Sequence, residues 1–169
     1  MNLSELGIKA RTASVLLAKM NVETKNKALI ACADALVKES NSILEANAKD
    51  VLIGREKGMN EGLVDRLMLT EERIKGIAEG LEQVAALDDP VGEVLDMKKR
   101  PNGLLIGKKR VPLGVVGMIY EARPNVTPDA FALCFKSGNA VILRGGSDAI
   151  NSNIAIVKVL QDTLKACGI

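Results

Sequence analysis

The sequence predicts an α/β protein built from a helical amino-terminal part, a β-hairpin and one βαβα unit. Three observations support this fold class. Apolar residues recur at helical spacing through residues 1–90, an alternating segment interrupted by Pro-Asn-Gly occupies residues 91–111, and residues 112–169 alternate apolar runs with amphipathic stretches. Buried strands that alternate with helices are typical of a parallel sheet.

The composition is that of an ordinary globular protein with an aliphatic core. Of the 169 residues, 47% are hydrophobic but only 2% are aromatic. The net charge of +2 and the scarcity of aromatic residues argue against a nucleic-acid partner. The chain has no histidine, which removes the commonest general base and the commonest metal ligand. We therefore expect no metal site.

The cysteines and the amino-terminal residues bear on the cellular compartment. Cys32, Cys134 and Cys167 are too few and too scattered for a disulfide framework, and three free thiols fit a reducing compartment. The chain does not begin with a basic segment followed by an apolar one, and no stretch approaches a membrane span. The expectation is a cytoplasmic protein without membrane contact.

Residues 1–90 are expected to be helical, with helix starts at Ser, Thr and acidic residues. The expected segments are Ser4 to Met20, Thr24 to about Lys57, a connector or short helix at residues 61–67, and Thr70 to about Leu87.

A β-hairpin is expected at residues 91–111. Asp88-Asp89-Pro90 ends the preceding helix, and Pro101-Asn102-Gly103 supplies a turn because Pro fixes φ while Asn and Gly tolerate positive φ. A long two-stranded ribbon is only marginally stable alone. We therefore expect it to pair with another sheet or another subunit.

The remaining residues 112–169 are expected to form a strand–helix–strand–helix unit. The expected elements are a buried parallel strand at residues 114–120, a helix with Thr127 as N-cap, Pro128 at its first position and Gly138 at its end, a buried strand at residues 140–143, and a helix at residues 150–166. Two parallel strands do not complete a domain, so the sequence is expected to stop in mid-fold.

The loop Arg144-Gly145-Gly146-Ser147 is a candidate anion site. It joins a strand to a helix amino terminus, where free N–H groups attract anions. The two glycines would let a phosphate approach the backbone, and Arg144 adds a forked donor. The alternative is a tight turn with a solvated arginine, because the loop lacks the Gly-x-Gly-x-x-Gly fingerprint.

The loop at residues 121–125 follows the first strand of the unit and is a second candidate. The Asn125 amide is a plausible donor to an oxyanion, and Glu121 and Arg123 could hold a zwitterionic substrate. Turn residues with a helix cap are the alternative. Cys134 lies on an apolar helix face with no histidine to activate it, so we expect a buried structural thiol, and we expect the same of Cys32 and Cys167.

Two runs carry a resemblance to a known family. Val-Pro-Leu-Gly-Val-Val-Gly-Met-Ile-Tyr-Glu-Ala-Arg-Pro-Asn-Val-Thr-Pro-Asp occupies residues 111–129, and Lys-Ser-Gly-Asn-Ala-Val-Ile-Leu-Arg-Gly-Gly-Ser occupies residues 136–147. Both closely resemble gamma-glutamyl phosphate reductase, which belongs to the aldehyde dehydrogenase superfamily. The earlier helices and the hairpin are similar too, so the resemblance covers the whole chain.

The resemblance implies NADPH-dependent reduction of L-glutamyl 5-phosphate to glutamate 5-semialdehyde and phosphate, a step of proline biosynthesis. Asn125 matches the donor to the oxyanion, and Glu121 and Arg123 are assigned to the substrate. Arg144, Gly145, Gly146 and Ser147 match the cofactor loop, where Ser147 replaces the Glu of NAD-preferring relatives and implies a preference for NADP.

The resemblance also implies domain roles and partners. Residues 1–90 and 112–169 would belong to a Rossmann-like nucleotide-binding domain, and residues 91–111 would be an oligomerisation flap that joins identical subunits. Glutamate 5-kinase is an implied candidate partner. The family's nucleophilic cysteine lies in a later segment that this sequence lacks, so residues 1–169 alone are expected to be inactive.

Two rival hypotheses remain open at this point. One is another aldehyde dehydrogenase, disfavoured by Arg-Pro-Asn in place of Pro-Trp-Asn and by Arg-Gly-Gly-Ser in place of Lys-Pro-Ser-Glu. The other is a non-catalytic interaction module that pairs through the hairpin.

Overall fold

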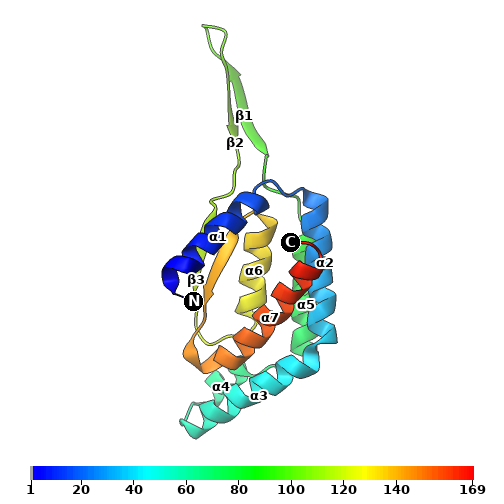
Figure 1. Cartoon of the computed structure of the whole chain (residues 1–169), viewed down its shortest axis with the longest axis vertical. Helices are drawn as coiled ribbons and strands as arrows, with labels where there is room; N and C mark the ends of the chain where they lie inside the picture. Colours follow the sequence, from blue (N-terminus) through cyan, green and yellow to red (C-terminus); the bar gives the residue numbers. More distant parts are fainter. Residues whose placement is uncertain (1) are drawn as a thin grey trace.

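The computed structural model describes residues 2–169 and shows a helical body from which a two-stranded ribbon projects (Figure 1). This mixed α/β arrangement confirms the predicted fold class. In chain order the elements are α1 (Leu3–Leu17), α2 (Val22–Lys38), α3 (Ser40–Glu56), α4 (Glu61–Leu67), α5 (Glu71–Ala86), β1 (Val94–Lys99), β2 (Leu105–Lys109), β3 (Val115–Ile119), α6 (Val126–Lys136), β4 (Ala140–Arg144), a 3₁₀ turn at Ser147–Ala149, and α7 (Ile150–Ala166).

Four of the helices begin at a side-chain cap, and these caps are Asn2, Asn21, Asn60 and Thr70. The cap of α5 is the predicted one. Those of α1 and α2 lie two and three residues before the expected Ser4 and Thr24. In both cases an asparagine side chain accepts the backbone N–H three residues later, and at α1 Glu5 completes a capping box. The sequence pattern misplaced these starts because several cap-forming residues stand close together.

The single helical segment expected from Thr24 to Lys57 is two helices. Glu39 has φ −93° and ψ 16°, which ends α2 and begins α3 without a side-chain cap. A continuous helix over this span would be about 50 Å long. The break lets α2 pack against α5 while α3 packs against α7 and α4. Tertiary packing therefore causes the break, because the junction between the two helices contains no proline or glycine that would predict it.

The core is aliphatic, as the composition indicates. Its fully buried side chains include Leu29, Leu36, Ile43, Leu81 and Ile156, which come from α2, α3, α5 and α7. Helix α6 lies among these helices and contacts α2, α5 and α7 (Figure 1). Among residues 2–169 no helix is both long and apolar enough to cross a membrane.

A buried ionic cluster anchors the base of the ribbon. Lys25 is 0% exposed, and its Nζ lies 2.5 Å from Asp89 Oδ2 and donates to the Lys136 carbonyl at 3.1 Å. Lys136 Nζ in turn donates to the Ala85 carbonyl at 2.8 Å. Burial lowers the pKa of Lys136, with Asp89 opposing that shift. Because Asp89 Oδ1 also accepts the Val91 N–H, the cluster ties the ribbon to α2, α5 and α6.

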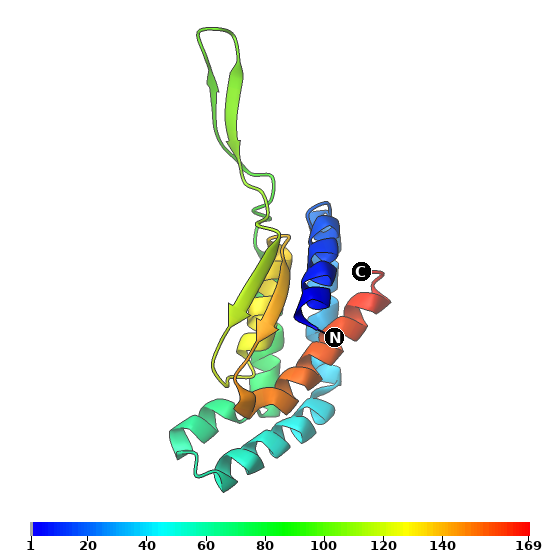
Figure 2. The same ribbon diagram turned by 60° about the vertical axis from the view of Figure 1, so that its left-hand side comes forward.

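The ribbon forms at the predicted place and stands clear of the body (Figure 2). Strands β1 and β2 pair antiparallel, and all their residues are exposed. The Pro-Asn-Gly turn confirms its predicted chemistry, since Gly103 has φ +88° and its N–H donates to the Arg100 carbonyl at 2.9 Å. The strands are shorter than the expected residues 91–111.

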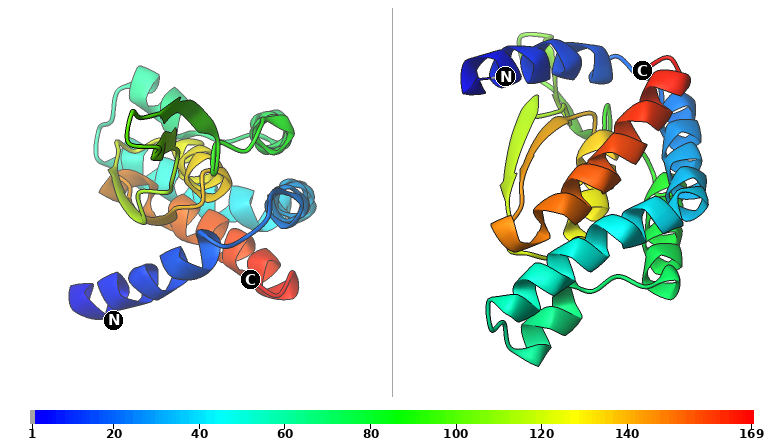
Figure 3. Two further views of the ribbon diagram at one scale, coloured as in Figure 1. Left: turned by 90° about the horizontal axis from the view of Figure 1, so that it is seen from above. Right: turned by 60° about the horizontal axis from the view of Figure 1, so that its bottom comes forward.

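Strands β3 and β4 are parallel, with register Val115↔Ala140 through Ile119↔Arg144. The expectation that β3 is buried was wrong: Val115, Gly117 and Ile119 are exposed, and Ile119 is 80% exposed. The reason is that β3 pairs only with β4, so the outer edge of β3 is unpaired and the face of β3 that carries Val115, Gly117 and Ile119 stays exposed (Figure 2). Helix α1 contacts both strands (Figure 3).

Candidate functional site

Two loops meet at the carboxyl edge of the β3–β4 sheet, as the topology predicts. The first loop, residues 120–125, follows β3 and leads into α6. The second, residues 145–149, follows β4 and leads into α7. Parallel pairing brings the strand ends together, because Ile119 lies beside Arg144 and Tyr120 N donates to the Arg144 carbonyl at 3.2 Å.

The glycines of the second loop are required by its packing against the first. A Cβ atom built on Gly146 would lie 2.8 Å from Ala122 N, and one on Gly145 would lie 3.1 Å from the Tyr120 ring and still closer to the Asn153 amide. From the sequence, these glycines were expected to let a phosphate approach the backbone. The structure accounts for both without a ligand, because two backbone segments approach each other here.

The amino end of α7, expected to offer free N–H groups to an anion, is already occupied by a carboxylate. Asp50, which is 2% exposed, accepts from Ser152 N at 2.7 Å, Ser152 Oγ at 2.6 Å and Asn151 Nδ2 at 2.7 Å. This charge meets the positive end of the helix dipole from inside the protein. An anion at the second loop must therefore rely on the loop itself and on Arg144.

A buried asparagine fixes the connection between α4 and α5. Asn47 Oδ1 accepts from Leu69 N at 2.7 Å, and its Nδ2 donates to the Leu67 carbonyl at 2.8 Å and to Ser152 Oγ at 3.0 Å. Both backbone partners lie just after Arg66. The Asn47 side chain thereby sets where the end of α4 lies relative to α3 and α7.

Thr127 was predicted to be the N-cap of α6, and this prediction is wrong. The helix starts at Val126 after Asn125, and Thr127 is fully buried inside its first turn. Its Oγ1 lies 2.6 Å from Tyr120 Oη and donates to Asn153 Oδ1 at 2.7 Å. This chain of hydrogen bonds joins the end of β3, α6 and α7, and so it positions the loop between them. The predicted end of α6 is confirmed, with φ +75° at Gly138.

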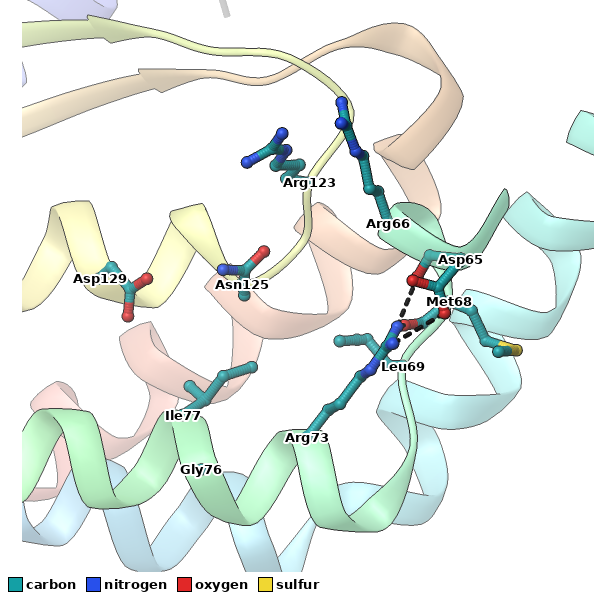
Figure 4. A pocket seen from close by; sticks show the side chains of 10 residues that line it. All are labelled: Asp65, Arg66, Met68, Leu69, Arg73, Gly76, Ile77, Arg123, Asn125 and Asp129. Carbon is teal, nitrogen blue, oxygen red and sulfur yellow. Dashed lines mark hydrogen bonds and ion pairs between the residues drawn. The ribbon is translucent and has the colours of Figure 1, made fainter. Parts of the chain in front are cut away.

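A cleft of about 460 Å³ opens between α4, α5 and the start of α6 (Figure 4). Arg123 and Asn125, from the loop after β3, line this cleft. Arg66 from α4 and Asp129 from α6 line it too. Figure 4 shows Asp129 on one side of Asn125, Arg66 on the other and Arg123 above Asn125. The cleft therefore has three arginines and Asp65 toward one end and the Asp129 carboxylate toward the other.

Only part of this charge is neutralised by ion pairs. Arg73 Nη2 lies 2.8 Å from Asp65 Oδ1, and Arg123 Nε lies 2.6 Å from Glu121 Oε1. The Arg123 Nε–H is not directed at that carboxylate and has no hydrogen-bond acceptor within residues 2–169.

The other two charged side chains of the cleft have no such partner. Arg66 and Asp129 form no side-chain ion pair or hydrogen bond with any described residue. Partial burial raises the pKa of the Asp129 carboxyl.

The predicted site residues fall into two places. Arg123 and Asn125 line the cleft and Glu121 contacts Arg123, whereas Arg144 is exposed at the end of β4 and Ser147 on the loop that follows it. Sequence reasoning missed four residues that build or line the site, namely Asn47, Asp50, Arg66 and Asp129. The first two carry no local signal, since a buried polar residue on a helix is recognised only from its distant partners.

None of the cysteines lies at the cleft. Cys32 and Cys134 are buried as predicted, and burial raises the pKa of both thiols, that of Cys32 to about 12. Cys167 was expected to be buried too but is exposed, because it follows α7 and lies beyond the helix's packed face. The part of the chain described here holds no cluster of three or more metal-ligating side chains.

Comparison with known proteins shows strong similarity to one group of enzymes. Gamma-glutamyl phosphate reductase of Lachnospira eligens is 58% identical over 168 residues, which is 99% of this chain and 40% of that protein. The crystal structure of gamma-glutamyl phosphate reductase from Thermotoga maritima superposes with a TM-score of 0.95 at 47% identity, over 98% of this chain and 40% of that one. The chain is homologous to the amino-terminal part of the gamma-glutamyl phosphate reductases.

Further comparisons agree with this homology. The Caldanaerobacter subterraneus reductase is 59% identical over 95% of this chain and 39% of its own length. A probable aldehyde dehydrogenase from Listeria monocytogenes, 17% identical with a TM-score of 0.68 over 94% of this chain and 32% of that one, shares the fold. No protein-family model matches the chain. The chain spans about 40% of the length of the curated relatives it matches.

Proposed function

We propose that residues 1–169 are the cofactor-binding and substrate-orienting part of an NADPH-dependent reductase that converts L-glutamyl 5-phosphate to glutamate 5-semialdehyde and phosphate. The observation that carries the proposal is the placement of Asn125, in a chain homologous throughout to reductases of this name. Its side chain lines the cleft at the amino end of α6.

Asn125 would stabilise the negative charge that develops on the carbonyl oxygen during acyl transfer. An amide donor fixed before the reaction lowers the energy of such an oxyanion, and the adjacent α6 amino end adds a favourable dipole. The Tyr120–Thr127–Asn153 hydrogen bonds hold the loop that carries this amide. Glu121 and Arg123, paired beside it, are proposed to contact the substrate.

The nucleophile for this reaction must come from outside residues 1–169. Cys32 and Cys134 are buried thiols with raised pKa values, which opposes formation of the thiolate. Cys167 is exposed but follows the 17 residues of α7, whose amino end packs beside the site loops, so it lies about 25 Å further along that helix. We accordingly propose that the isolated chain does not turn over substrate.

The loop Arg144-Gly145-Gly146-Ser147 is proposed to contact NADPH, which would supply the hydride. Arg144 is exposed at the end of β4 and forms no ion pair within the described residues, so its guanidinium is available to a phosphate. Ser147, also exposed, places no negative charge beside a 2′-phosphate. Since Asp50 already occupies the α7 amino end, Arg144 is the group on which the preference for NADPH would depend.

We also propose that identical subunits associate through residues 91–111 and that the protein acts in the cytoplasm. The fully exposed ribbon supports the first point, and the free cysteines suit a reducing compartment. Glutamate 5-kinase, which would supply the acyl phosphate, is a proposed partner. A second candidate function, a non-catalytic module that pairs through the ribbon, is favoured by the same exposure of β1 and β2.

The cofactor proposal is tested in a complete reductase whose amino-terminal part is residues 1–169. Calorimetric titration with NADPH and NADH is expected to show a preference for NADPH that Arg144→Ala lowers about 10- to 100-fold, because a charge-assisted contact to the 2′-phosphate is lost. Arg11→Ala, an exposed arginine on α1, is the matched control and should leave both affinities unchanged. An equal loss for both nucleotides would contradict the assignment.

A further inference from the structure

Asp129 lines the cleft, but the proposed function assigns no role to it. It follows Asn125 by four positions on α6, so the two side chains line the same cleft about 6 Å apart along the helix axis (Figure 4). The cationic side chain of Arg66 lies beyond Asn125 in the other direction, and that of Arg123 lies above Asn125. Asn125 therefore stands between an anionic and a cationic part of the cleft.

The Asp129 carboxylate is partly desolvated but unpaired. Ile77 and Gly76 from α5 and the Asn125 amide line the cleft beside it, and Figure 4 shows the other charged residues that line the cleft farther toward α4 and the loop after β3. Its pKa is raised by desolvation alone, with no opposing contribution from a cation. The Asp129 side chain is exposed to the cleft, so its unpaired carboxylate is free to receive a cationic group of a ligand.

Two helix glycines leave space in front of Asp129. A Cβ atom built on Gly76 would meet no atom within 4 Å, and one on Gly80 would meet only Asp129 Oδ1, at 3.9 Å. Neither glycine has the positive φ that requires this residue. Since neither glycine places a side chain here, the space between α5 and Asp129 stays open to a ligand.

We propose that Asp129 binds the α-ammonium group of the amino-acid substrate and so determines which acyl phosphates are accepted. This inference rests on the proposed function. In glutamyl 5-phosphate the reacting carbonyl carbon and the α-nitrogen are four bonds apart, about 5 Å when extended. That separation matches the distance along α6 from Asn125 to Asp129, with the carbonyl at Asn125 and the ammonium at Asp129.

The same orientation of the substrate places its phosphoryl group near the arginines of the cleft. With the carbonyl at Asn125, the phosphoryl oxygens extend away from Asp129 and toward Arg66 and Arg123. A reversed substrate would bring the phosphoryl charge to the Asp129 carboxylate. That contact is repulsive, whereas the forward direction places the phosphoryl group near guanidinium groups, so the charge order in the cleft favours the forward direction.

The test uses a complete reductase with residues 1–169 at its amino terminus, assayed in the direction of aldehyde oxidation with phosphate and NADP⁺. Two aldehydes are compared, glutamate 5-semialdehyde and 5-oxopentanoate, which has the same carbon chain without the ammonium group. Asp129→Asn is expected to lower kcat/KM for the semialdehyde about 10- to 100-fold, mainly through KM, because a charge-assisted hydrogen bond is lost. The 5-oxopentanoate value and the KM for phosphate should not change.

Controls separate this role from a structural one. Glu79→Gln removes an exposed carboxylate on α5 outside the cleft and should alter neither aldehyde's kinetics. Asp129→Glu keeps the charge and should restore part of the discrimination. Equal losses for both aldehydes, or no loss with the semialdehyde, would overturn the inference while leaving the reductase activity established. If the unsubstituted enzyme fails to oxidise the semialdehyde, the proposed function fails, and the inference with it.

Discussion

Asn47 and Asp50 lie one turn apart on α3, and their side chains decide the geometry of a site to which neither belongs. Asp50 occupies the amino end of α7, and Asn47 holds the backbone on both sides of Met68. Each is at most 2% exposed, so every polar atom needs a partner inside the protein. The result is a fixed framework on which the more exposed residues Arg66 and Arg123 can face a ligand.

At the same scale, Asp129 gives the stability of the protein a pH dependence. Burial raises its pKa above the ordinary value of 3.8, so the native state holds this proton more tightly than the unfolded state does. The contribution of Asp129 therefore favours the fold at low pH and falls as pH rises from the unfolded pKa through the folded one.

Asp129→Asn should remove this decline. Urea unfolding at a series of pH values is expected to show the variant gaining stability relative to the unsubstituted protein as pH rises above about 4. Glu79→Gln serves as the exposed-carboxylate control. Parallel stability curves for Asp129→Asn and the unsubstituted protein would show that the Asp129 pKa does not change on folding.

Among the elements, the junction between α5 and β1 depends on the buried ion pair of Lys25 and Asp89. The Lys25 side chain is fully buried and that of Asp89 is 16% exposed, so each charge relies on the other rather than on water. This junction sets where the ribbon leaves the body. Sequence patterns marked Asp88-Asp89-Pro90 only as a helix end.

Lys25→Ala should destabilise the protein by about 3 kcal/mol, because it leaves Asp89 and the Lys136 carbonyl without their buried donor. Lys27→Ala on the same helix breaks an exposed pair with Glu23 and should have no measurable effect. Chemical denaturation of both variants measures the difference. A Lys25→Ala midpoint equal to that of Lys27→Ala would show that the cluster does not stabilise the fold.

In the molecule as a whole, the projecting ribbon has no partner within the described residues, while its strands carry exposed apolar side chains. Leu105 and Ile106 are 65% and 54% exposed, and they pair in register with Lys99 and Lys98. A two-stranded ribbon of this kind is stabilised when further strands or another surface cover it. This supports its proposed role in joining subunits.

Replacing Leu105 and Ile106 together by Gln should lower the molar mass of the assembly in size-exclusion chromatography with light scattering, because apolar contact area is lost. The matched control replaces their strand partners Lys98 and Lys99 by Gln and should leave the mass unchanged. The circular dichroism of the body should be the same in both variants. An unchanged mass for the apolar variant would exclude the ribbon as the subunit contact.

The sequence by itself determined the order and type of the elements apart from the break between α2 and α3, the Pro-Asn-Gly turn, the end of α6 at Gly138 and the resemblance to gamma-glutamyl phosphate reductase. Each of these depends on residues close together in the chain, whose spacing, capping and turn chemistry act locally. The same local character let the pattern place Asn125 and Arg144 on loops at one edge of the sheet.

Only the tertiary structure decided the rest. It broke the helix at Glu39, filled the α7 amino end with Asp50, left one face of β3 exposed, and placed Arg66 and Asp129 on opposite sides of Asn125. The physical reason is common to all four. Each outcome depends on which distant segment packs against a residue, and partners such as Asp50 and Ser152, separated by 102 positions, leave no periodic trace in the chain.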